Sequence, residues 1–88
     1  MKLSLNIELI YQNSKMGMKL TVKAKFKASR ENFEKFSEGM YLIYLPFEED
    51  EESWKLIAEL ISKKIGTPVG RIEFVAKDVR GNYVYELV

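Results

Sequence analysis

The chain has 88 residues, a formal net charge of +1, and neither cysteine nor histidine. This length makes a single domain. The missing cysteines exclude disulfides, thiolate metal sites and cysteine nucleophiles. The missing histidines exclude the commonest general base, the usual zinc ligand and Ser-His-Asp triads. We therefore predict a non-enzymatic protein, with no catalytic residue, no cofactor and no metal.

Apolar residues make up 47% of the chain, enough for a globular core. No apolar run approaches the roughly 20 residues of a membrane span. Asn6 and Glu8 interrupt the N-terminal segment at alternate positions, which favours a strand over a signal peptide. We therefore expect a cytoplasmic protein with no membrane partner. Lys and Glu dominate the charged residues, as in many thermophile proteins.

Apolar and polar residues alternate in two segments near the N terminus. The first runs from Leu3 to Leu9 and the second from Lys19 to Lys27, with a polar, glycine-containing stretch over 12–17 between them. A period of two is typical of a strand with one buried face. The pattern predicts a hairpin whose two apolar rows share one face.

Residues 29–39 allow two interpretations. Ser29 can cap a short helix in which Phe33 and Phe36 lie on one side, and Gly39 suits a left-handed end. An irregular loop held by the two phenylalanines is the alternative. The apolar run 40–45 that follows predicts a buried central strand.

The main helix is predicted from an apolar stripe between residues 54 and 65. Its members fall three and four residues apart: Trp54, Ile57, Ala58, Ile61 and Ile65, widened by Leu60. Asp50 or Ser53 supplies the cap, and acids in the first turn favour the positive end of the dipole. Gly66 and Pro68 end the helix.

Two closing strands are expected over 71–77 and 82–88, joined by a turn over 78–81. The chain order is then strand, strand, short helix or turn, strand, helix, strand, strand. This order predicts an α+β domain of two layers. A five-stranded mixed or antiparallel sheet is covered on one face by one main helix, and residues 1–88 form a single domain.

The segment Leu20 to Arg30 (LTVKAKFKASR) resembles the opening strand and Lys-Ala-Ser-Arg turn of YggU-like proteins, a family of small proteins of unknown function. Gly39, a strand ending at Pro46, an acidic loop, a helix and two strands follow in the family's order. The similarity covers roughly residues 18–88, so it implies a YggU-like core with an added N-terminal strand. The resemblance brings no catalytic residues. Pro46-Phe47-Glu48-Glu49 stands where the family has a Pro-Pro-x-x-Gly loop.

A row of lysines is the first candidate site. Lys19, Lys23, Lys25 and Lys27 lie on one side of their predicted strand, and Arg30 extends the row. Side chains on that face repeat about every 6.8 Å, on the scale of phosphate spacing in nucleic acid. Lysines also protect an exposed sheet face from pairing with another chain. Single-strand binding normally adds aromatic side chains, which this row lacks.

The acids have ordinary explanations. The run from Glu48 to Glu52 suits a helix start and lacks the pattern of a calcium loop. Glu8, Glu73 and Glu86 are expected to pair across strands rather than to form an acid–base pair. Most tyrosines, with Trp54 and Phe74, are expected in the core.

One sheet face should remain open, with Ile10, Val75 and Val79 on or near it. We therefore predict an interaction or accessory domain that binds a protein partner or forms a homodimer. The alternative is weak binding of an RNA or DNA backbone through the lysine face.

Overall fold

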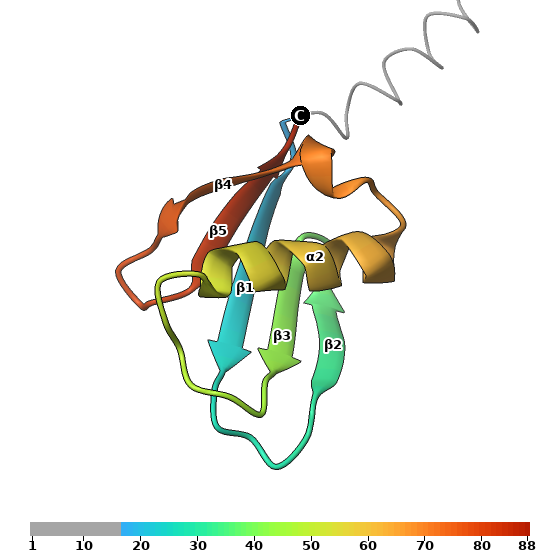
Figure 1. Ribbon diagram of the computed structural model, residues 1–88. Coiled ribbons are helices and arrows are strands. Elements are labelled where there is room, and N and C mark those ends of the chain that lie inside the picture. The colour runs from blue at the N-terminus through green and yellow to red at the C-terminus, as the bar shows by residue number, and fades with distance from the viewer. Residues whose placement is uncertain (1–16) are drawn as a thin grey trace, which may run out of the picture.

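The computed structural model describes residues 17–88, which form one mixed sheet and one long helix (Figure 1). The sheet has five strands in the order β2-β3-β1-β5-β4. Their bounds are β1 Lys19–Lys25, β2 Asn32–Ser37, β3 Met40–Tyr44, β4 Ile72–Lys77 and β5 Tyr83–Leu87. The helix, α2, spans Ser53–Ile65 and lies across one face of the sheet. The predicted two-layer α+β architecture is therefore confirmed.

Strand β1 is the central strand of the five, and both of its edges are paired. It runs parallel to β3, with Val22 opposite Tyr41, and antiparallel to β5, with Leu20 opposite Tyr85. The strand predicted over 3–9 lies outside the described residues. The predicted hairpin would pair that strand with β1, but one edge of β1 is paired with β3 and the other with β5.

Residues 32–37 form a strand, so the predicted short helix or loop is wrong here. Strand β2 pairs antiparallel with β3, and Gly39, with a φ of 78°, makes the tight turn between them. A left-handed glycine ends a helix and closes a hairpin equally well, so Gly39 fits both structures. Pairing with β3 decides between them, since the strand gains backbone hydrogen bonds to β3 along most of its length.

The helix begins later than its acidic residues. Ser53 is its first residue, so the acids at 48–52 precede the first turn and do not form part of it. Asp50 and Ser53 close the turn before the helix: the Asp50 N–H donates to Ser53 Oγ at 2.9 Å, and Asp50 Oδ1 accepts from the Glu52 N–H at 2.8 Å. Gly66 ends the helix with a φ of 76°, as predicted.

The core lies between α2 and the face of the sheet that it covers. Ile57 and Ile61 of the helix are fully buried there, together with alternate residues of the strands. Trp54 is more exposed than the stripe predicted, and its ring stacks on Phe74 with 5.7 Å between centroids. No helix within residues 17–88 has both the length and the apolar character to span a bilayer.

Candidate functional site

The sheet face opposite α2 is the open face, and strand alternation assigns its side chains. Because Leu20 and Val22 are buried under the helix, the residues between and beside them face the other way. The parallel register extends this face to β3 and the antiparallel register extends it to β5. Its central members are Lys19, Thr21, Lys23 and Lys25 of β1, Met40, Leu42 and Tyr44 of β3, and Val84 and Glu86 of β5.

A hollow of about 250 Å³ lies on this face, and we call it the basic hollow. Phe36 and Met40 form its apolar side, and both are well exposed, at 60% and 47%. Lys23 and Arg80 are its cations. No aspartate or glutamate is among its described lining residues, which also include Thr21, Tyr41 and Asn82. The basic hollow therefore combines an exposed ring with two positive charges.

Alternation along β2 brings Phe36 to the basic hollow, and a β-bulge leaves it without a register partner. The register of β2 against β3 shifts between Lys35 and Ser37, so Phe36 is the extra residue. Lys35 points to the helix side, and Phe36 points to the open face. Phe33, three residues earlier, lies on the helix side and packs on Tyr41 at 5.2 Å between ring centroids.

The turn between β4 and β5 brings Arg80 and Asn82 to the same hollow. The carboxylate of Asp78 accepts from the Arg80 N–H at 2.9 Å, the Asn82 N–H at 2.8 Å and Asn82 Nδ2 at 3.2 Å. These bonds lower the pKa of Asp78, and the bond from the backbone N–H of Asn82 has the largest effect. The turn is thus organised around one carboxylate, which is ionised at neutral pH.

The structure separates the five basic residues that were predicted as one row. Lys23 and Lys25 lie together on the open face, as expected. Lys19 shares that face, but its register partner is Glu86. Lys27 follows the end of β1, with a φ of 60°, and its Nζ lies 3.9 Å from Glu48.

Arg30 lines a different hollow. That hollow, of about 450 Å³, lies at the other end of β3 and also contains Tyr44, Glu31 and Glu34. Tyr44 lies opposite Lys25 in the register, so a second aromatic residue stands beside the lysines. Phe36, Tyr44 and Arg80 are functional candidates that the local pattern missed, because only the pairing of distant strands places them beside β1.

On the opposite edge, Glu49 ties the loop before α2 to the sheet. It accepts from Lys77 Nζ at 2.6 Å and from the Tyr83 hydroxyl. The pKa of Glu49 is lowered, first by the bond from Lys77 and then by the bond from Tyr83. The pKa of Tyr83 is raised, first by burial and then by its bond to Glu49. Each of the three side chains has a hydrogen-bond partner within this cluster, and these bonds hold the loop in place.

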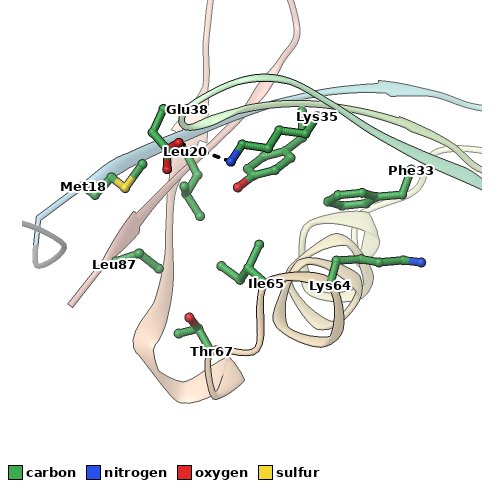
Figure 2. A pocket seen from close by; sticks show the side chains of 10 residues that line it. Met18, Leu20, Phe33, Lys35, Glu38, Lys64, Ile65, Thr67 and Leu87 are labelled. Atoms are coloured by element: carbon green, nitrogen blue, oxygen red, sulfur yellow. Dashed lines mark hydrogen bonds and ion pairs between the residues drawn. The ribbon is translucent and has the colours of Figure 1, made fainter.

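A groove of about 350 Å³ opens between the sheet, the C-terminal end of α2 and the segment that follows it (Figure 2). Leu20, Ile65 and Leu87 give it an apolar floor that continues the core. Its polar groups engage each other: Lys35 bonds Glu38 at 3.2 Å, and Lys64 Nζ lies 5.8 Å from the centroid of Phe33. With these partners the groove offers a ligand less unpaired charge than the basic hollow does.

Among the described residues no three acidic side chains converge as a metal site would require. Comparison of the chain with protein-family models, curated proteins and solved structures finds no match. The resemblance to YggU-like proteins therefore stays a prediction.

Proposed function

We propose that the open face binds single-stranded nucleic acid, with little dependence on sequence. The observation that carries this proposal is the position of Phe36, exposed in the same hollow as Lys23 and Arg80. Proteins that bind single strands combine cations along the backbone with aromatic rings on which bases stack. Tyr44 beside Lys25 supplies a second ring further along the sheet. We also propose that the domain is YggU-like and acts without catalysis.

The distribution of charge favours weak binding. Lys23, Lys25 and Arg80 form no ion pair with any residue in the described range 17–88, so their charge is available to phosphates. Glu73 and Glu86, by contrast, face each other across β4 and β5 at the far end of the open face. We expect a dissociation constant of about 10–100 µM at ~50 mM salt, in the range of non-specific binding.

The test is fluorescence anisotropy with a labelled oligothymidylate of about 12 nucleotides. Three phosphate contacts predict a slope of about −2 for the logarithm of the association constant against that of salt concentration. Lys23→Gln should make that slope less negative by about 0.7. Phe36→Leu, which keeps an apolar side chain but removes the ring, should weaken binding about 5-fold or more without changing the slope.

Lys63→Gln is the matched control, because Lys63 is exposed on the last turn of α2, the helix on the other side of the sheet. It removes the same charge and should leave both affinity and slope nearly unchanged. Equal effects of Lys63→Gln and Lys23→Gln would mean that only overall charge matters. Absence of binding at ~50 mM salt would refute the proposal.

A second candidate is association with a protein partner or with a second copy of the chain. Val75, 56% exposed, lines a hollow of about 400 Å³ with Lys19, Val84 and Glu86 at the end of the open face remote from Phe36. This function predicts a sedimentation coefficient that rises with protein concentration and a smaller rise in Val75→Lys. An unchanged coefficient up to millimolar protein would exclude self-association through this surface.

A further inference from the structure

The basic hollow depends on the turn between β4 and β5, which the sequence predicts only as a connection. Arg80 and Asn82 reach the open face because the chain reverses over 78–82, with Gly81 at a φ of 84°. The Asp78 N–H donates to the Asn82 carbonyl, and the Gly81 N–H donates to the Asp78 carbonyl, both at 2.9 Å. Together with the side-chain bonds of Asp78, these contacts leave the turn one well-defined shape.

We propose that Asp78 is a positioning residue for nucleic-acid binding: its carboxylate holds Arg80 and Asn82 in the wall of the basic hollow, which seats one nucleotide. This inference rests on the proposed function and deepens it. The base stacks on Phe36 and lies against Met40, while Lys23 and Arg80 bind the adjoining phosphate. A hollow of about 250 Å³ has room for one nucleotide rather than several.

The amide of Asn82 has a defined orientation in this arrangement. A carboxylate only accepts hydrogen bonds, so Nδ2 of Asn82 must face Asp78 Oδ2, from which it lies 3.2 Å away. The acceptor Oδ1 is then the amide atom without a partner among the described residues, and it is available to a donor on the bound nucleotide. Thr21, on the floor of the same hollow, offers a hydroxyl.

The proposal has a consequence opposite in sign to that of simple electrostatics. Asp78 is an anion beside a site for anions, so its charge alone opposes binding, and its removal should tighten binding. If Asp78 instead positions Arg80 and Asn82, its removal weakens binding despite the gain in net positive charge. The lowered pKa of Asp78 is consistent with a carboxylate committed to these bonds.

The experiment compares Asp78→Ala with Glu73→Ala, in anisotropy titrations with the same oligothymidylate. Both variants remove one negative charge, but Glu73 lies on β4 outside the basic hollow. Glu73→Ala should tighten binding about twofold. Asp78→Ala should weaken it about three- to tenfold and make the salt slope less negative by about 0.7, as expected for one lost phosphate contact.

Two further variants distinguish a loss of positioning by Asp78 from a general disturbance of the structure. Asp78→Asn keeps an oxygen that can accept from both backbone N–H groups, so it should recover most of the affinity. In an Arg80→Gln background, Asp78→Ala should cause much less weakening, because the cation that it positions is already gone. Tightening in Asp78→Ala, or full weakening in the Arg80→Gln background, would overturn the proposal. If the unaltered protein binds no oligonucleotide, the proposed function itself fails.

Discussion

Gly39 is a point of close backbone approach between the β2–β3 turn and β1. It joins β2 to β3, is buried, and its carbonyl accepts from the Thr21 N–H at 2.7 Å. A Cβ placed on it would lie 2.8 Å from the backbone oxygen of Lys19. Glycine is therefore required here both by its φ of 78° and by the proximity of β1.

We expect Gly39→Ala to lower the free energy of unfolding by about 3 kcal/mol or more, since it adds a backbone clash to the cost of a left-handed alanine. Gly81→Ala is the control. Gly81 has a φ of 84° but no atom within 4 Å of the added Cβ, so only the conformational cost of about 1–2 kcal/mol applies. Urea unfolding measures both changes. Equal losses would show that β1 moves away from the new methyl group at little cost.

Strand β2 separates what local pattern can predict from what it cannot. Phe33 and Phe36 are three residues apart, a spacing that a helix turns to one side and a strand turns to opposite sides. Nothing within residues 29–39 distinguishes these, because β2 exists through its pairing with β3. The helix over 53–65 was predictable, since its apolar stripe is sustained over three turns and ends at Gly66.

The same distinction applies to the candidate site. Lys23 and Lys25 could be assigned to one face from alternation in β1 alone, and this was confirmed. Phe36 and Arg80 could not be assigned to that face from the local pattern. Their positions depend on the sheet order from β2 to β5, which joins strands that are distant in the sequence. Because β2 is a strand, the open face carries the aromatic side chain that the predicted row of lysines lacked. We therefore rank nucleic-acid binding above binding of a protein partner.

Both edge strands are protected against pairing with another sheet. Strand β2 and strand β4 each carry a bulge, and charged residues such as Glu34 and Lys77 lie along them. Bulges and charges at an edge hinder the addition of a further strand. Association of two copies through their sheet edges is therefore disfavoured. The open face is then the part of the sheet that is left for a partner to bind.

Over the whole molecule, a net charge of +1 conceals a separation of charge. Lys23 and Lys25 lie on the open face and Arg80 reaches its basic hollow from the β4–β5 turn, while the acidic run at 48–52 lies in the loop before α2. Part of that loop is neutralised, since Glu48 lies near Lys27 and Glu49 bonds Lys77. The loop acids thus fix the connection to α2 and lie away from the basic hollow, whose described lining contains no acidic side chain.

The bonds of Glu49 to Lys77 and Tyr83, together with the burial of Tyr83 and Tyr85, give the stability of the molecule a defined dependence on pH. The pKa of Glu49 is lowered from its ordinary value of 4.5, so its contribution is present above that pH and is lost as pH falls through the lower folded value. The pKa values of Tyr83 and Tyr85 are raised from 10.0, mainly by burial. Their contribution is present below pH 10.0 and is lost as pH rises toward the higher folded values.

We therefore expect the free energy of unfolding to be level between about pH 6 and 7, where the chain has no histidine to titrate, and to fall below pH ~4.5 and above pH ~10. Tyr83→Phe should make both limbs shallower, because it removes one raised pKa and one hydrogen bond that lowers the pKa of Glu49. Glu49→Gln should flatten the acid limb and leave the alkaline contribution of Tyr85 in place. Urea unfolding across the pH range tests this, and limbs of unchanged steepness in Tyr83→Phe would show that this bond does not carry the dependence.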